Sequence, residues 1–351
     1  MDVLSLRSYD YILPKELIAK YPANPKENAK LLVYNRRDKS IIHSNFWNFA
    51  NFLPQDTLLV FNDTKVIPAR FYGKKVLKDS KIGQQGAKIE ALFHKELESN
   101  SYLLQCKGRL KEGARIAFVG NIIAEIIKDK GMGFKEVRFF EVADGVLKPL
   151  KKEKFFAFLE QYGHIPLPPY IKRETKIQDR EDYNAVFAKH LGAIAAPTAS
   201  LHFSEGTFNA LTQNFKHTYV TLHIGAGTFM GVSVDNILEH KIHKESFYIS
   251  QESQQKISEA THITAIGTTA TRVVEYFGLT GYGRGECDLF LHLPNKPLLT
   301  KALLTNFHLP KTTLLMLVAS FVGLEEMQRI YKEAIKEQYR FYSYGDGMLI
   351  L

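Results

Sequence analysis

The chain has 351 residues, of which 45% are hydrophobic, 12% aromatic and 24% charged, and this composition predicts a soluble globular protein long enough for two domains. The longest apolar run near the C-terminus, "LLMLVASFVG", is shorter than the roughly 20 residues that span a bilayer, and the N-terminus lacks the residue order of a signal peptide, so we expect a cytoplasmic protein without a membrane segment. The formal net charge of +9 fits either a solubilising lysine-rich surface or a polyanionic partner such as nucleic acid.

The first 65 residues predict mixed structure. A short helix is expected in "LPKELIAKYP", opened by Pro14 and stopped before Pro22, and two strands around a polar turn in "AKLLVYNRRDKSIIHS". The run "TLLVFND", residues 57–63, predicts a buried strand with a polar end. From residue 66 onward, short β-type runs recur at a spacing of roughly ten residues, without a long amphipathic helix. This rhythm predicts a small all-β barrel or sandwich.

Helical periodicity returns at "KKEKFFAFLEQYG", after which strands and helices alternate. We expect strands at 218–223, 245–249, 262–267, 286–291 and 347–351. We expect helices at 205–215, 250–260, 268–277, 310–321 and 324–336. The alternation predicts a mixed α/β fold, with a larger α/β domain formed by residues 1–65 and 146–351 and an inserted small antiparallel β-barrel domain at 66–145.

A glycine-rich loop follows the strand expected at 218–223. In "TLHIGAGTFMG" the spacing of Gly225, Gly227 and Gly231 is one residue longer than the dinucleotide-binding fingerprint, and no P-loop pattern is present. The glycines then serve either a tight turn with positive φ or the close approach of a ligand to the backbone. We favour the second interpretation.

Two further strand–loop–helix segments resemble ligand sites, because ligands of α/β sheets bind beyond the carboxyl ends of strands. In "HITAIGTTATRVVE", Thr268 and Thr269 open a helix that carries Arg272. In "TNFHLPKTTLLMLV", Asn306 and His308 precede a helix. Plain N-capping by threonine explains the first segment at least as well, and core packing is the better explanation of the apolar run in the second.

The sequence gives only weak indications of a metal site or an RNA-binding site. The two cysteines, Cys106 and Cys287, lack CxxC partners, which excludes a disulfide framework and a cysteine-based zinc site. His240 and His243 have no clear third ligand, so we expect no metal. The segment "GHIPLPPYIKRETKIQDREDYNAVFAKH" is basic and stiffened by proline, and it suits either RNA contact or an ordered linker.

Taken together, several stretches resemble one family. They are "LLVFNDTKVIPAR", "GHIPLPPYIKR", "DREDYNAVFAKH", "AIAAPTASLHF", "VTLHIGAGTF", "IGTTATRVVE", "TNFHLPKTTLLMLVASF" and "YRFYSYGDGMLIL". The family is that of the S-adenosylmethionine:tRNA ribosyltransferase-isomerases of queuosine biosynthesis. The chain departs from the family pattern at "TTATRVVE", "GECDLFL" and "CKGRLKEG", and residues 66–145 match poorly beyond the last of these.

The resemblance implies that S-adenosylmethionine is consumed as a ribosyl donor. The ribosyl moiety is transferred to 7-aminomethyl-7-deazaguanine at the wobble position of tRNA and isomerised, which gives epoxyqueuosine-tRNA, adenine and methionine. It also implies an α/β domain with an inserted β-barrel and no metal or other cofactor; we expect a monomer. Two alternatives are an S-adenosylmethionine-dependent RNA methyltransferase and a non-catalytic RNA-binding module.

The implied chemistry predicts the site residues. The sulfonium acidifies the 5′-carbon, so a base is needed, and histidine has a suitable pKa. The predicted catalytic residues are His223, His202 and Asp63. The predicted S-adenosylmethionine-binding residues are Gly225, Gly227, Thr228, Phe229, Thr268, Thr269, Arg272, His308 and Tyr344. The predicted tRNA-binding residues are Lys65, Arg70, Tyr170, Lys172, Arg173 and Arg340.

Overall fold

The computed structural model describes residues 2–77, 85–225, 227 and 231–351. Contacts divide the chain into two compact units, described separately below. The sheet unit consists of Met1–Val66, Pro168–Glu174 and Glu181–Leu351, and the barrel unit consists of Ile67–Leu167 and Thr175–Arg180. The domain limits expected from the sequence, 1–65 with 146–351 and 66–145, stay a prediction.

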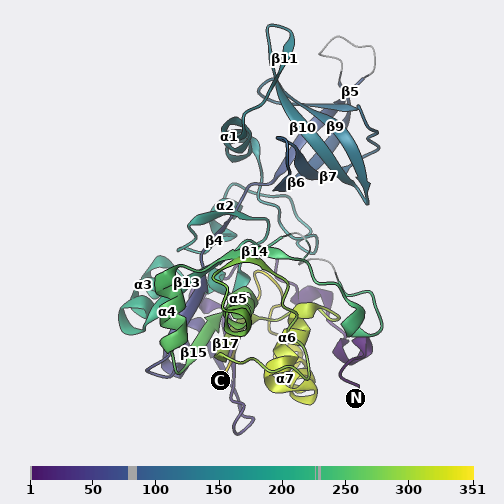
Figure 1. Cartoon of the computed structure of the whole chain (residues 1–351). Coiled ribbons are helices and arrows are strands. Elements are labelled where there is room, and N and C mark those ends of the chain that lie inside the picture. Colours follow the sequence, from purple (N-terminus) through teal and green to yellow (C-terminus); the bar gives the residue numbers. More distant parts are fainter. Residues whose placement is uncertain (1, 78–84, 226, 228–230) are drawn as a thin grey trace. The chain divides into compact units, whose positions relative to one another are not determined.

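The sheet unit is built on a nine-stranded mixed sheet with the order β16-β14-β13-β3-β15-β17-β18-β1-β2. Figure 1 labels β13, β14, β15 and β17 of this sheet. Its strands are β1 (Lys30–Tyr34), β2 (Ile41–Asn45), β3 (Leu58–Asn62), β13 (His217–Leu222), β14 (Glu245–Tyr248), β15 (Ile263–Ile266), β16 (Arg284–Cys287), β17 (Thr300–Asn306) and β18 (Gly347–Ile350). The four neighbours β13, β3, β15 and β17 run parallel. A separate parallel pair joins β4 (Thr64–Val66) to β12 (His190–Ala193).

Helices cover both faces of this sheet. They are α3 (Glu205–Asn214), α4 (Gln251–Glu259), α5 (Thr268–Thr280), α6 (Thr313–Val322) and α7 (Leu324–Lys336), and the short α2 (Asp179–Asp182) lies at the unit boundary. In β1, Leu31 and Val33 pack into one apolar cluster, whereas Leu32 and Tyr34 pack into another that includes α6 and α7. Because successive strand side chains point to opposite faces, the sheet is buried on both sides.

The strand order creates a switch point beside β3. The chain passes from β3 to β13 on one side and later to β15 on the other side, while α5 packs across all four parallel strands. Crevices form at the carboxyl ends of strands where the direction of winding reverses. The fold therefore places a ligand crevice at the ends of β13, β3, β15 and β17.

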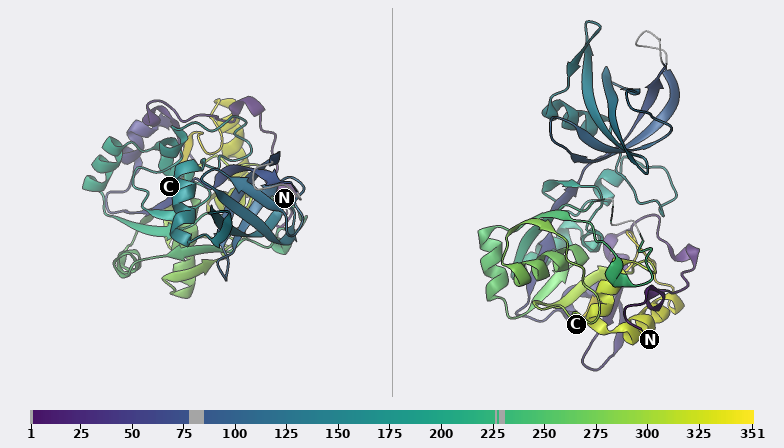
Figure 2. Two further views of the ribbon diagram at one scale, coloured as in Figure 1. Left: turned by 90° about the horizontal axis from the view of Figure 1, so that it is seen from above. Right: turned by 45° about the vertical axis from the view of Figure 1, so that its right-hand side comes forward.

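The barrel unit is a ring of antiparallel strands. Its elements are β5 (Arg70–Val76), β6 (Gln85–Glu96), β7 (Tyr102–Lys107), β8 (Arg115–Phe118), β9 (Ile122–Gly131), β10 (Phe134–Ala143), β11 (Val146–Pro149) and α1 (Lys152–Tyr162). Six strands pair in the cycle β10-β7-β6-β5-β8-β9, which closes through β9 and β10, as the right-hand view of Figure 2 shows. The mixed α/β fold with a small antiparallel barrel is thus confirmed.

Helix α1 completes the core of the barrel unit. Phe155 is fully buried, with its ring centroid 4.3 Å from that of Tyr102 and 4.5 Å from that of Phe139. We expect Phe155→Ala to lower the free energy of unfolding by about 3–5 kcal/mol, because it leaves a cavity among these rings. Urea unfolding measures this loss. Tyr162→Ala at the exposed end of α1 is the control, and an equal loss in both variants would contradict the assignment.

The structure corrects three sequence-based elements. No bounds were predicted for the strand β17, because a short buried apolar run cannot be assigned to a strand or a helix by periodicity. The strand expected at 286–291 is β16, which ends at Cys287. The helix expected in "LPKELIAKYP" is one 3-10 turn, Lys15–Leu17, because the two prolines leave too few residues for more. No helix among the described residues is long and apolar enough to cross a membrane.

Candidate functional site

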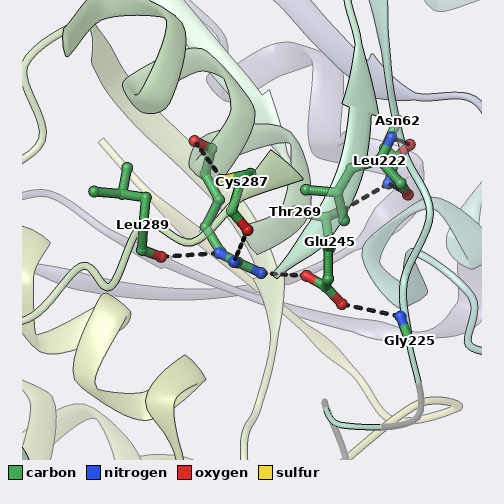
Figure 3. A network of polar contacts seen from close by, with 8 residues as sticks. Asn62, Leu222, Gly225, Glu245, Thr269, Cys287 and Leu289 are labelled. Atoms are coloured by element: carbon green, nitrogen blue, oxygen red, sulfur yellow. Dashed lines mark hydrogen bonds and ion pairs between the residues drawn. The ribbon is translucent and has the colours of Figure 1, made fainter. Parts of the chain in front are cut away.

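The ends of β3 and β13 are tied together by Asn62, whose side chain is fully buried. Its Nδ2 donates to the carbonyl oxygen of Leu222 at 3.1 Å and to Oγ1 of Thr269 at 3.1 Å. Its Oδ1 accepts from the amide of Leu222 at 3.0 Å (Figure 3). Since Thr269 lies in the first turn of α5, one amide fixes two strand ends and a helix start around the crevice.

His223 and Asp63 extend from these strand ends. Nδ1 of His223 lies 2.8 Å from Oγ1 of Thr64, and Gly192 packs so closely on the imidazole that a Cβ there would clash with it. Oδ1 of Asp63 accepts a hydrogen bond from Thr221 at 2.6 Å. The structure therefore brings two of the three predicted catalytic residues to one edge of the sheet.

His190 is a member of this cluster that the sequence analysis missed. Its Nε2 lies 3.5 Å from Oδ2 of Asp63. No strand was predicted at β12. The pairing of β12 with β4 is what brings His190 next to Thr64 and so to this cluster. The available signal was its place at the end of the quoted "DREDYNAVFAKH" stretch.

The surroundings of His223 keep its imidazole neutral. Burial lowers the pKa of His223 below the ordinary value of 6.5, and His190 lowers it further, whereas the Asp63 carboxylate raises it. Nε2 of His223 has no hydrogen-bond partner among the described residues. When Nδ1–H donates to Thr64, Nε2 carries the lone pair and can accept a proton.

These shifts predict a pH profile. If His223 must be neutral to accept a proton, kcat/KM rises with pH to a plateau, and its midpoint lies below pH 6.5. Asp63→Asn removes the charge that stabilises the imidazolium, so the midpoint should move to lower pH. Adenine release at limiting S-adenosylmethionine, the activity that the family resemblance implies, measures this profile. A midpoint that rises or stays unchanged in Asp63→Asn would contradict this assignment.

A cavity lies at the ends of β15 and β17 in the sheet unit. Four of the predicted S-adenosylmethionine-binding residues line it, namely Thr268, Thr269, Arg272 and His308. The α5 N-cap is Gly267, with φ +95° and no side-chain cap, so threonine N-capping does not explain the threonine pair. Asn306 and Tyr183 also line the cavity; neither was predicted as a binding residue, although Asn306 lies in the strand–loop–helix segment "TNFHLPKTTLLMLV".

Tyr170 also lines this cavity, although the sequence analysis predicted a tRNA contact. Its hydroxyl lies 2.7 Å from Oγ of Ser343. Its ring stacks on Tyr342, with centroids 4.4 Å apart. Tyr170 thus forms part of the wall of the cavity.

Arg272 is committed to a buried ion pair with Glu245, a residue that the sequence analysis did not assign to the site (Figure 3). Its Nε also donates to the carbonyl oxygen of Leu289 at 3.1 Å. Oε1 of Glu245 accepts from the amide of Gly225 at 3.0 Å. The pair therefore anchors the start of the glycine loop.

Gly225 does not have positive φ, so the tight-turn interpretation does not apply to this glycine. A Cβ on Gly225 would meet no described atom within 4 Å, whereas Gly227 packs against the imidazole of His243. Two predicted residues, Thr228 and Phe229, lie outside the described residues.

His202, His308 and Tyr344 are buried side chains. His202 stacks on Phe46 with centroids 4.0 Å apart, and its Nε2 lies 3.3 Å from Nδ2 of Asn306. Burial lowers the pKa of His202 and of His308 to about 3, so both are neutral at physiological pH. Their predicted roles stay predictions.

The predicted tRNA contacts in the sheet unit differ in their availability. Lys65 and Lys172 are exposed. Nη2 of Arg340 donates to Oδ1 of Asp346 at 2.9 Å. The two lysines are therefore the more available phosphate contacts.

The other two predicted arginines also make internal contacts. In the barrel unit, Nη2 of Arg70 donates to the carbonyl oxygen of Leu167 at 3.1 Å. In the sheet unit, Nε of Arg173 donates to the carbonyl oxygen of Lys20 at 2.9 Å. Within the described ranges, no group of three or more His, Cys, Asp or Glu side chains could hold a metal ion.

The fold and the site define an α/β protein with a ligand cavity at the carboxyl ends of parallel strands, combined with a small β-barrel. The model of the queuosine biosynthesis protein family matches residues 6–350. The chain belongs to this family.

Named relatives agree over the whole length. The chain is 50% identical to an S-adenosylmethionine:tRNA ribosyltransferase-isomerase from Helicobacter pylori strain HPAG1, with 100% of both chains covered. It is 50% identical to an enzyme of the same name from Campylobacter jejuni, with 99% of both covered. It also resembles the crystal structure of S-adenosylmethionine tRNA ribosyltransferase from Thermotoga maritima, with 28% identity, a TM-score of 0.52, and 98% of this chain and 100% of that chain covered.

Proposed function

We infer that this chain is an S-adenosylmethionine:tRNA ribosyltransferase-isomerase of queuosine biosynthesis. It transfers the ribosyl moiety of S-adenosylmethionine to 7-aminomethyl-7-deazaguanine at the tRNA wobble position and isomerises it, which yields epoxyqueuosine-tRNA, adenine and methionine. The observation that carries this conclusion is the 50% identity over the full length of both chains.

The reaction needs a base beside the sulfonium, because the positive sulfur acidifies the adjacent 5′-carbon. We assign this base to Nε2 of His223: the imidazole is neutral, it has a free lone pair, and the next residue, Ile224, lines the cavity. Asp63 lies beside it and favours the imidazolium once the proton has been taken. His202 contacts the cavity residue Asn306, so we assign His202 a role in positioning that amide in the cavity.

The substrate-binding roles follow the same geometry. Thr268, Thr269 and His308 face S-adenosylmethionine in the cavity, and Arg272 holds the loop at Gly225 through Glu245. The exposed Lys65 and Lys172 contact tRNA phosphates, so affinity for tRNA falls as salt concentration rises.

The cellular form is also part of this proposal. The enzyme acts as a monomer in the cytoplasm, where the free, buried thiols of Cys106 and Cys287 suit a reducing environment. Sedimentation of the protein at the concentrations used in the activity assay measures the oligomeric state. A stable dimer would contradict the monomer.

The products distinguish this function from its alternatives. The purified protein is incubated with S-adenosylmethionine and tRNA that carries 7-aminomethyl-7-deazaguanine, and the small molecules are separated by chromatography. We expect adenine and methionine in amounts equal to the epoxyqueuosine formed. S-adenosylhomocysteine would indicate a methyltransferase, and unchanged S-adenosylmethionine would indicate an RNA-binding module without catalysis.

A further inference from the structure

Asn306 carries a buried hydrogen-bond acceptor without a partner. The residue ends β17, lines the cavity of the sheet unit and is 2% exposed. Its Oδ1 makes no hydrogen bond with the part of the chain that the structure describes. Such an acceptor is costly to leave unsatisfied, and nearly all buried polar atoms in proteins have a partner. Because Asn306 also lines the cavity, its Oδ1 is an acceptor available to a ligand donor.

The orientation of this amide is fixed by its other contacts. Nδ2 of Asn306 donates to the carbonyl oxygen of Tyr342 at 3.1 Å. A carbonyl oxygen only accepts, so a flipped amide would set two acceptors face to face. Nδ2 also lies 3.3 Å from Nε2 of His202, and the neutral His202 imidazole accepts there when its proton is on Nδ1. The free atom is thus the oxygen and not the nitrogen.

The walls near Asn306 select among the donors of S-adenosylmethionine. The described lining includes Ala195, Ala199, Phe307 and Tyr342 beside hydroxyl-bearing side chains such as Thr305 and Ser343. Its apolar members suit a flat aromatic base. It contains no carboxylate, and its guanidinium, Arg272, is paired with Glu245. A neutral amide oxygen in a cavity whose described lining has no carboxylate favours a neutral N–H donor over the ammonium of the methionine moiety, whose charge needs a counterion once it is buried.

We propose that Asn306 determines base specificity, with Oδ1 accepting a hydrogen bond from the exocyclic 6-amino group of adenine in S-adenosylmethionine. This assignment rests on the proposed function for the identity of the ligand. A 6-oxo base in the same position presents an oxygen to Oδ1, so neither atom can donate. The site therefore rejects S-inosylmethionine, the 6-oxo analogue, by about ten- to hundredfold, the range typical of an unpaired buried polar group.

Calorimetric binding of S-adenosylmethionine and S-inosylmethionine to the full-length protein tests this proposal. We expect the wild type to bind the 6-oxo analogue about ten- to hundredfold more weakly. In Asn306→Ala the affinity for S-adenosylmethionine should fall, and the ratio of the two dissociation constants should approach one. Equal binding of the two ligands by the wild type, or an undiminished ratio in Asn306→Ala, would overturn the proposal.

The wild-type comparison stands even if Asn306→Ala does not fold, because it needs no variant. Adenine release with tRNA substrate is measured in parallel and reports on the proposed function alone. A protein that discriminates between the two ligands in binding but releases no adenine supports the base assignment and refutes the ribosyl transfer. A protein that releases adenine but binds both ligands equally does the reverse.

Discussion

His223→Gln should abolish turnover while S-adenosylmethionine and tRNA still bind. Glutamine has a similar size and can still bond to Thr64, but it cannot accept a proton at neutral pH. The loss of a general base typically costs about 10²–10⁴-fold in rate. Adenine release under single-turnover conditions measures the chemical step, and calorimetry measures the affinity for S-adenosylmethionine.

A matched control comes from the same strand. His217 begins β13 and is half-buried, whereas His223 follows the end of that strand. His217→Gln should leave the rate unchanged, since its side chain lies at the opposite end of β13 from the crevice. Adenine release by His223→Gln at nearly the wild-type rate would remove His223 from the role of base.

Glu245→Gln should destabilise the protein by about 3–5 kcal/mol, because it leaves the buried guanidinium of Arg272 without its counterion. Both side chains are less than one-tenth exposed. The amide of Gly225 also loses a charged acceptor, so the glycine loop loses its anchor and the affinity for S-adenosylmethionine falls. Urea unfolding and calorimetry measure the two effects.

Two variants control for this effect. Glu245→Leu combined with Arg272→Met removes both charges and should recover most of the stability but not the affinity, because the acceptor for Gly225 is still missing. Glu252→Gln breaks an exposed pair with Lys256 and should not change stability measurably. If Glu245→Gln were as stable as Glu252→Gln, the buried pair would not be the anchor described above.

Much of the fold could be predicted from local patterns. The alternation of strands and helices predicted the α/β sheet, and the short β-type runs predicted the barrel. The spacing of the glycines argued against a phosphate-binding loop. The stretches from "LLVFNDTKVIPAR" to "YRFYSYGDGMLIL" were specific enough for the family, which the comparisons then confirmed. These features could be predicted because each depends on residues that are close together in the sequence.

The composition of the site could be predicted only in part. Asp63, His223, Thr268 and His308 were expected at strand ends and helix starts, and the structure places them there. The contacts of Arg272 and the burial of His202 and Tyr344 were not foreseen. Local sequence indicates that a side chain ends a strand, but not which distant side chain will meet it.

The sequence by itself determined the family, the reaction and the types of element, because these follow from motifs and hydrophobic periodicity. Only the tertiary structure decided that Glu245 pairs with Arg272, that Thr64 meets His223 across 159 residues of sequence, and that Asn306 keeps a free acceptor. Those contacts depend on the order of strands in the sheet and on the packing of both its faces. That order is selected by the burial of the whole chain and not by any single segment.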